Sequence, residues 1–229
     1  MTACAANNAT GVTSWGMETF AERQLINILL LFIGKSTDTQ TTFGNGNMNG
    51  NTNKPAGSDS NGVLPTGTMD DKGLFWGSDT DNLGVKVFGI EHWWGNLWRR
   101  VVGYFNDNGV YKVKLTKSRY DGTSVSDYNT TGVGYIAYSS LTPSEGYIRA
   151  MDVSQWGLVA KSAGSGASTA AYYCDHQWVN NSQLNMALFG GRCADGLHCG
   201  AFACHLYDTV GHHYWNFGAS PSLHPSIPA

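Results

Sequence analysis

The sequence predicts an α+β domain in which many short strands and one or two helices are joined by long loops. The chain has 229 residues, and 41% of them are hydrophobic, which is enough for one substantial core. It also has 29 glycines, and glycine permits the positive φ angles of tight turns. After residue 73, short apolar runs alternate with turn residues, a pattern that indicates several strands of a few residues each.

The first expected element is an amphipathic helix over residues 15–33. The segment WGMETFAERQLINILLLFI contains good helix formers, and its polar positions become rarer toward Gly34. Residues 35–70 then turn to Asn, Gly, Thr and Ser, a composition that cannot bury enough apolar area for a core. We therefore expect an N-terminal part, residues 1–70, made of this helix and an Asn/Gly-rich loop that lies on the rest of the protein.

Residues 71–229 are expected to form the main domain. Its centre is predicted at residues 85–104, because VKVFGIEHWWGNLWRRVVGY carries more aromatic area than a surface requires. Asp107-Asn108-Gly109 indicates a tight hairpin turn, and the alternating strand that follows begins at Tyr111. Further strands are expected at 134–138, 157–160, 172–178, 187–189, 201–206 and 214–217.

Charge and hydropathy exclude several kinds of partner. Only 14% of residues are charged and the net charge is -3, so we expect no binding to nucleic acid. The longest apolar stretch, residues 25–33, is shorter than the roughly 20 residues that span a bilayer, so no membrane span is expected. The first ten residues lack the basic and apolar regions of a signal peptide, and none is predicted.

The sequence lacks the motifs of common catalytic sites. It contains no GxSxG motif, and none of its four glutamates stands beside a second acid in a motif. Its five cysteines show no CxxC spacing, so we expect no disulfide framework, no metal and no cofactor. Trp93, Trp94 and Trp98 are expected to be core residues instead of a sugar-stacking platform. Arg99 and Arg100 are expected to be salt-bridged or solvated.

Several segments carry a resemblance to a known family. Residues 88–103, FGIEHWWGNLWRRVVG, resemble the GNVWEW-type motif of the formylglycine-generating-enzyme branch of the C-type lectin fold. Residues 187–193 (ALFGGRC), 199–202 (CGAF) and 214–220 (YWNFGAS) resemble the variable proteins that retroelements diversify on phage tails and bacterial surfaces. The likeness covers most of the chain. It implies a C-type lectin fold whose variable region spans residues 174–224.

The residue types of the C-terminal region agree with such diversification. Retroelements of this kind mutate adenines, so asparagine codons of the AAY type never become codons for Lys, Glu, Gln, Met or Trp. Residues 187–214 contain none of these five types, although the rest of the chain uses them. Chance also produces such a gap in a window chosen after inspection, and codon-level data would separate the two explanations.

The resemblance implies that side chains of the C-terminal strands project to one face and bind a ligand. Four pieces would hold the backbone: Phe189-Gly190-Gly191, Gly200-Ala201-Phe202, Trp215 and Phe217-Gly218-Ala219. The ligand-binding residues expected around them are His176, Trp178, Asn180, Asn185, Arg192, Cys193, Asp195, Leu197, His198, Cys204, His205, Tyr207, His212, His213, Tyr214 and Asn216.

The partner implied by the resemblance is a host-cell surface protein or glycan, met from a phage tail or a bacterial cell surface. The N-terminal part would contact other tail or virion proteins, and a homotrimer would add avidity. The EPN and QPD motifs of calcium-dependent lectins are absent, so calcium is not expected. Two alternatives remain open. One is a copper-dependent oxidase of the formylglycine-generating type that uses Cys199 and Cys204, and the other is a tail or capsid protein without a ligand.

Overall fold

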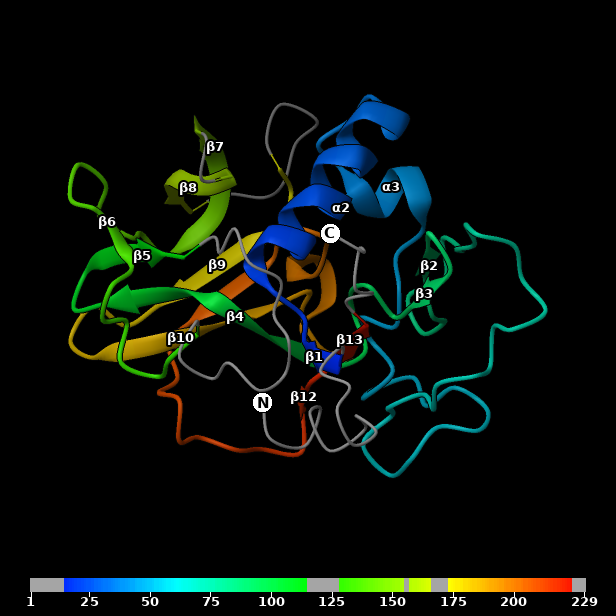
Figure 1. The fold of residues 1–229 in the computed structure, drawn as a ribbon. Coiled ribbons are helices and arrows are strands. Elements are labelled where there is room, and N and C mark those ends of the chain that lie inside the picture. Colours follow the sequence, from blue (N-terminus) through cyan, green and yellow to red (C-terminus); the bar gives the residue numbers. More distant parts are fainter. Residues whose placement is uncertain (1–14, 115–127, 155–156, 166–172, 224–229) are drawn as a thin grey trace, which may run out of the picture.

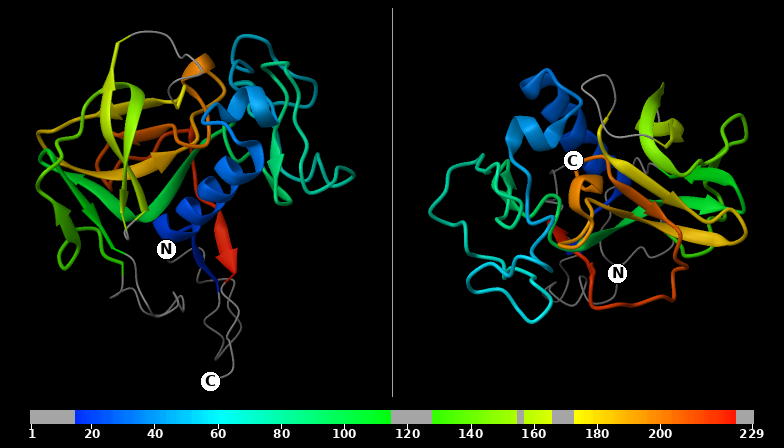
Figure 2. Two further views of the ribbon diagram at one scale, coloured as in Figure 1. Left: turned by 90° about the horizontal axis from the view of Figure 1, so that it is seen from above. Right: turned by 180° about the vertical axis from the view of Figure 1, so that it is seen from behind.

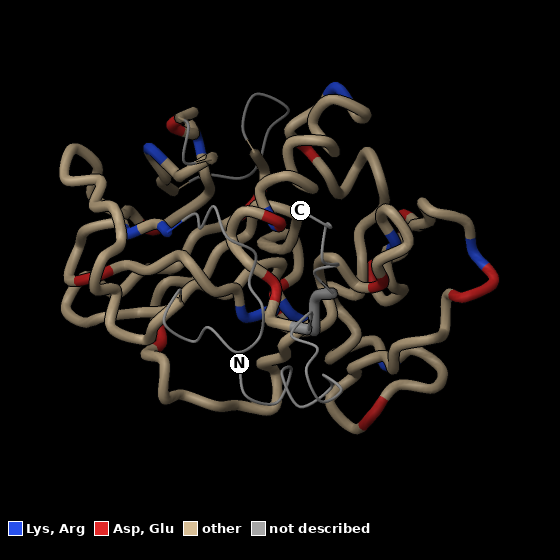
Figure 3. Tube along the Cα trace, in the orientation of Figure 1, with Lys and Arg blue, Asp and Glu red and all other residues tan. Residues whose placement is uncertain are grey.

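The fold is mixed α+β, as the sequence predicts. The computed structural model describes residues 15–114, 128–154, 157–165 and 173–223. Residues 1–14 of the predicted N-terminal part, residue 172 of a predicted strand and residue 224 of the implied variable region lie outside the described part. Within that part, two α-helices lie beside a curled β-sheet, and an irregular segment, residues 44–84, extends beyond the helices (Figures 1 and 2). Charged residues are spread along the trace (Figure 3).

The large sheet contains nine strands, and most neighbours are antiparallel. Its order is β6 (Ile136–Tyr138), β5 (Val110–Val113), β4 (Trp98–Asp107), β10 (Leu184–Phe189), β11 (Cys204–Leu206), β9 (His176–Val179), β7 (Gly146–Ser154) and β8 (Gly157–Gly164). The ninth strand, β12 (Phe217–Gly218), pairs in parallel with β4, and β11 pairs in parallel with β9. Two small sheets pair β1 (Trp15–Met17) with β13 (Pro221–Leu223) and β2 (Lys86–Val87) with β3 (Ile90–Glu91).

The first helix begins later than the sequence pattern suggested. Helix α2 covers Phe20–Gly34 because Thr19 caps it: the Glu22 amide donates to Thr19 Oγ1 at 3.2 Å, and the Thr19 amide donates to Glu22 Oε2 at 2.8 Å. This reciprocal capping box fixes the first turn. The expected helix over residues 15–33 is therefore wrong for Trp15–Met17, which form β1 instead.

The Asn/Gly-rich segment is fixed to the rest of the protein by buried amides. Apart from the short helix α3 (Thr39–Phe43), most of residues 35–70 are irregular. The fully buried Asn47 donates from Nδ2 to the Gly62 carbonyl at 2.8 Å and to Asn96 Oδ1 at 2.8 Å. The Asn47 side chain thus joins two distant points of this loop to each other and to the connection between β3 and β4. These hydrogen bonds order a segment that has too few apolar side chains to form a core of its own.

The predicted hairpin is confirmed, whereas several strands, among them β1, β7 and β13, were not predicted. Asn108 and Gly109 have φ angles of 50° and 86° between β4 and β5, the positive pair that a type I′ turn requires. Strand β7 escaped prediction because its pairing with β8 shifts register near Ala150. Such bulges break the period of two from which strands are recognised.

The core draws on both sides of the boundary predicted at residue 70. Phe20 of α2 packs among Tyr104 and Phe189 of the sheet, with ring centroids 4.5 and 6.2 Å away. A second buried cluster joins Leu30 of α2 to Trp93 and further apolar side chains. Trp93 and Trp94 are 1% and 0% exposed, so the prediction that they are core residues is confirmed.

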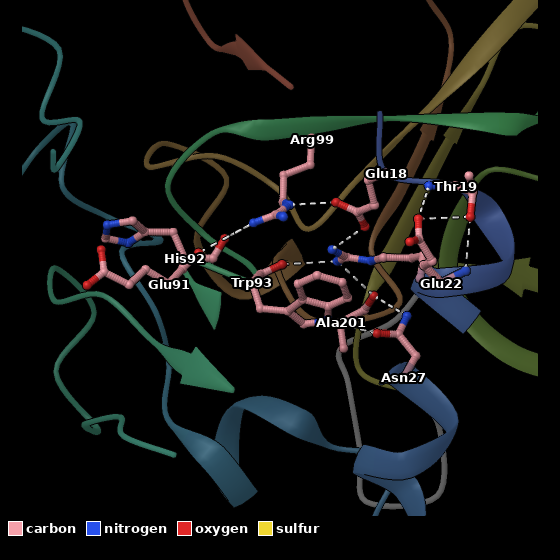
Figure 4. A network of polar contacts seen from close by, with 10 residues as sticks. Glu18, Thr19, Glu22, Asn27, Glu91, His92, Trp93, Arg99 and Ala201 are labelled. Atoms are coloured by element: carbon pink, nitrogen blue, oxygen red, sulfur yellow. Dashed lines mark hydrogen bonds and ion pairs between the residues drawn. The ribbon is translucent and has the colours of Figure 1, made fainter. Parts of the chain in front are cut away.

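A buried ion network connects β1, α2 and β4 (Figure 4). The Glu18 carboxylate lies between two guanidinium groups, with Arg99 Nε 2.9 Å from Oε2 and Arg23 Nη1 3.5 Å from Oε1. Arg23 is fully buried, and its Nη2 donates to the carbonyls of Trp93 at 3.0 Å and Ala201 at 3.2 Å. Burial lowers the pKa of Arg23 to about 10, so the side chain stays charged at neutral pH.

We predict that Glu18→Gln lowers the free energy of unfolding by about 3 kcal/mol, because it leaves two buried guanidinium groups without an anionic partner. Denaturant titration followed by circular dichroism measures this change. Glu145→Gln is the matched control, since Glu145 is exposed, and it should change the stability by less than about 0.5 kcal/mol. Equal stability of the two variants would contradict a structural role for the network.

Candidate functional site

One face of the large sheet carries a cluster of Trp and His rings. On β9, His176 and Trp178 point to this face, while the intervening Gln177 is buried and donates to the Tyr111 hydroxyl at 2.8 Å. On β11, His205 pairs in register with Trp178. Trp98 of β4 completes the base of the cluster, with its ring centroid 5.3 Å from Trp178 and 5.2 Å from His205.

Further rings extend this cluster in two directions. His198 lies in a short 3-10 turn (Gly196–His198). Its ring centroid is 4.7 Å from that of His176 and 5.2 Å from that of Tyr147 of β7. At the other end, Phe217 lies 5.1 Å from Tyr214, which in turn lies 5.7 Å from His212. We call this set the ring surface: Trp98, Tyr147, His176, Trp178, His198, His205, Tyr207, His212, Tyr214, Trp215 and Phe217.

A cavity of about 410 Å³ opens within the ring surface. The C-terminal segment forms one wall of it, with Tyr207, Tyr214 and Trp215 exposed to 47%, 53% and 47%. Arg100 holds this segment in place, because its guanidinium donates to the carbonyls of Val210, at 3.2 Å, and His212. The cavity is lined by Trp98, Trp178, Arg192, Asp195, His205, Tyr207, Asp208, Tyr214, Trp215, Asn216 and Phe217.

The charged groups of the cavity are two carboxylates and one guanidinium. Arg192 Nε lies 2.9 Å from Asp195 Oδ1, and burial raises the pKa of Asp195 while this ion pair opposes the rise. Asp208 lies between two imidazoles, 2.7 Å from Nδ1 of His212 and 3.7 Å from Nδ1 of His205. The second distance is too long for a hydrogen bond.

Two histidines of the ring surface are neutral at pH 7. Burial lowers the pKa of His176 to about 4, and the nearby His198 adds to the effect. Burial also lowers the pKa of His205 to about 4, against the attraction of Asp208. Within the described residues, Nδ1 of each ring has no hydrogen-bond partner. Both nitrogens are enclosed by the surrounding side chains, so they are unsatisfied polar atoms of the interior and do not face the cavity openly.

Ten of the residues expected to bind a ligand belong to the ring surface or line its cavity. They are His176, Trp178, Arg192, Asp195, His198, His205, Tyr207, His212, Tyr214 and Asn216. Leu197 and His213 are exposed and are adjacent in sequence to His198 and Tyr214 of the ring surface. Asn180 is half-buried. The sequence-based expectation that these side chains share a region agrees with this arrangement for most of the set.

Three expected contact residues are buried away from the cavity, so the prediction is wrong for them. Asn185 is 0% exposed, and its Nδ2 donates to the Asn180 carbonyl at 2.6 Å. Cys193 is also 0% exposed, and its thiol donates to the Asn61 carbonyl at 3.4 Å. Cys204 is 3% exposed and faces the core from β11. Asn216 is 7% exposed but lines the cavity.

Other residues of the site were missed by sequence reasoning. Trp98 was assigned to the core alone, although its ring forms the floor of the cavity. Trp215 was assigned to the backbone scaffold, yet it is 47% exposed. Tyr147 and Asp208 were not considered. The available signal was the alternation of Trp215 and Phe217 around Asn216, which would place two aromatic side chains on one side of a strand. The structure instead forms a turn there, in which the Phe217 amide donates to the Tyr214 carbonyl at 3.1 Å.

The cysteines lie in environments that disfavour thiolate chemistry. None of the four described cysteines forms a disulfide. Cys199 donates to the Arg192 carbonyl at 3.3 Å, whereas Cys204 packs in the core with Phe20 and Tyr104. Burial raises the pKa of both thiols. Among the described residues, no group of three or more His, Cys, Asp or Glu side chains is arranged to hold a metal ion.

A second cavity, of about 540 Å³, lies on the other side of β4. Successive residues of this strand separate the two, since Trp98 lines the ring-surface cavity and Arg99 lines the second one. Apolar side chains such as Leu25 and Ile26 line this second cavity, together with Glu18 of the ion network. The carboxylates of Glu18 and Glu91 in this lining are engaged in holding the fold, whereas Nδ1 of His92 has no hydrogen-bond partner among the described residues.

No protein-family model matches the chain, and no curated protein matches its sequence. In the described part of the chain, none of the helices combines the length and the apolar character that crossing a membrane requires.

We predict that His205→Gln makes the protein less sensitive to acid. The folded-state pKa of His205, about 4, lies below the usual value of 6.5, so its contribution to stability is present above pH 6.5 and is lost as the pH falls toward 4. Between pH 7 and pH 5 the variant should lose about 1–2 kcal/mol less unfolding free energy than the wild type.

Denaturant titrations at the two pH values measure this difference. His213→Gln is the matched control, because His213 is exposed. If the wild type and His205→Gln lose equal unfolding free energy on acidification, the prediction that His205 is buried in its neutral form is wrong.

Proposed function

We propose that this chain is a ligand-recognition protein of C-type lectin type, in which a diversified C-terminal region binds host surface molecules. The ring surface is the observation that carries the proposal. It gathers aromatic side chains from strands far apart in sequence, and its most exposed rings, Tyr207, Tyr214 and Trp215, belong to the C-terminal region. Large rigid rings give contact area at a low entropy cost, which is why they dominate adaptable binding surfaces.

The division between scaffold and surface also supports this proposal. In β9 and β11 the side chains that face the core, Gln177, Cys204 and Leu206, are 1%, 3% and 0% exposed. The alternate positions, His176, Trp178 and His205, lie outside the core clusters around Phe20 and Leu30, although Trp178 packs against a smaller cluster with Trp98. Replacement of positions outside the main core costs less stability, which is the condition under which a region tolerates diversification.

The proposed setting is a phage tail or a bacterial cell surface. The partner would be a host-cell surface protein or glycan, and the N-terminal part would contact other tail or virion proteins. A homotrimer would raise the avidity of a weak single site. The oxidase alternative receives no support from the buried, protonated state of Cys199 and Cys204, since the thiolate is the reactive form.

We predict that replacing Tyr207, Tyr214 and Trp215 together by alanine lowers binding to host cells at least about tenfold, because exposed rings of this type carry much of the energy of recognition. Flow cytometry of the labelled protein on a panel of bacterial strains measures binding. The double variant Leu25→Ala/Phe32→Ala is the control, since these side chains are 59% and 74% exposed on α2, away from the rings.

Unchanged cell binding by the triple variant, on a strain that the wild type binds, would overturn the proposed function and favour a tail or capsid protein without a ligand. The neighbouring DNA offers an independent check. A near-identical repeat that differs at adenines, next to a reverse-transcriptase gene, is expected if the C-terminal region is diversified.

A further inference from the structure

The rings around the 410 Å³ cavity stand at large angles to one another. The planes of Trp98 and Trp178 meet at 89°, and those of Tyr214 and Phe217 meet at 86°. A sugar stacks on one flat ring face, whereas rings at right angles enclose a compact guest from several sides. The negative π faces of such rings attract cations.

The charge of the lining also favours a cation. Asp195 and Asp208 contribute two carboxylates, and Arg192 contributes the one guanidinium among the lining residues. Arg192 is committed to Asp195 at 2.9 Å. His205 adds no positive charge at neutral pH, because burial lowers its pKa. Among the lining residues, the negative charge that is not paired with Arg192 belongs to Asp208, whose Oδ1 lies 2.7 Å from Nδ1 of His212.

One oxygen of this carboxylate is the acceptor that a guest can use. His212 Nδ1 lies 2.7 Å from Oδ1, whereas His205 Nδ1 lies 3.7 Å from Oδ2 and is itself too enclosed for a guest to reach. An N–H-bearing cation in the cavity can donate to Oδ2 of Asp208. The polar groups of Arg192 and Asp195 are already paired with each other, so they offer little to a guest rich in hydroxyl groups.

We infer that this cavity binds the side chain of a lysine on the partner protein. Its ammonium group donates to Oδ2 of Asp208, and its methylene stem lies against Tyr214, Trp215 and the rings beneath them. This inference rests on the proposed function and specifies the ligand chemistry of the same surface. An amino sugar shares the ammonium group, but its hydroxyls would lose water without finding free partners in the cavity.

The test uses Nα-acetyl-lysine methylamide as the probe, with intrinsic tryptophan fluorescence of the full chain as the readout. The expected dissociation constant is about 1–10 mM, as befits a single side chain. The norleucine analogue, which keeps the stem and lacks the charge, should bind at least about tenfold more weakly. Equal binding of the two probes, or no binding of the lysine probe, overturns the inference. Tighter binding of glucosamine than of the lysine probe also overturns it.

Two variants locate the site. Asp208→Asn removes the charge, and Trp215→Leu removes an exposed ring, so each should weaken the lysine probe about threefold to tenfold. Asp71→Asn and Phe32→Leu are matched controls at exposed positions outside the cavity, and they should bind like the wild type. Thermal melts show whether each variant is folded. If Asp208→Asn does not fold, Trp215→Leu alone tests the site. Unchanged binding by a folded Trp215→Leu contradicts the site.

The outcomes separate this inference from the proposed function. If the triple alanine variant loses cell binding but the lysine probe does not bind, recognition by the ring surface stands and the lysine chemistry fails. If the probe binds at Asp208 while the triple variant still binds cells, the cavity exists but the proposed function fails.

Discussion

The fold depends on one buried carboxylate. Glu18 follows β1, and its two oxygens meet Arg23 of α2 and Arg99 of β4. Removal of these charges from water is costly, and the arrangement is stable only because every partner is present in the correct geometry. Arg23 passes the constraint on to the carbonyls of Trp93 and Ala201, so the central strand, the helix and the C-terminal region are fixed against one another.

Strand β4 transmits this rigidity to the candidate site. Arg99 belongs to the ion network, and the adjacent Trp98 forms the base of the ring surface on the opposite face. The next residue, Arg100, holds the carbonyls of the segment that forms the cavity wall. Three consecutive side chains thus join the buried ion network to the base of the ring surface and to the wall of its cavity. Preorganisation of this kind reduces the entropy lost on binding.

The sequence was informative where local chemistry decides the structure. The Asn108-Gly109 turn, the tryptophan-rich core and the crowding of His and aromatic residues in the C-terminal region follow from residue types alone. The sequence was silent where tertiary contacts decide. Asn185 and Cys204 are residues of the same types, in the same segment of the sequence, as residues that face solvent. Only the pairing of the strands shows that these two side chains face inward. Glu18 and Arg99 lie 81 residues apart, and no local pattern predicts that they meet.

The antiparallel pairing of β1 with β13 has a practical consequence. Trp15 lies opposite Leu223, so the first and the last described strands lie side by side. A domain with neighbouring entry and exit points can be inserted as a cassette into a loop of a larger chain with little disturbance to either. The same geometry makes the domain suited to grafting onto an unrelated carrier, with its rings left free to sample other molecules.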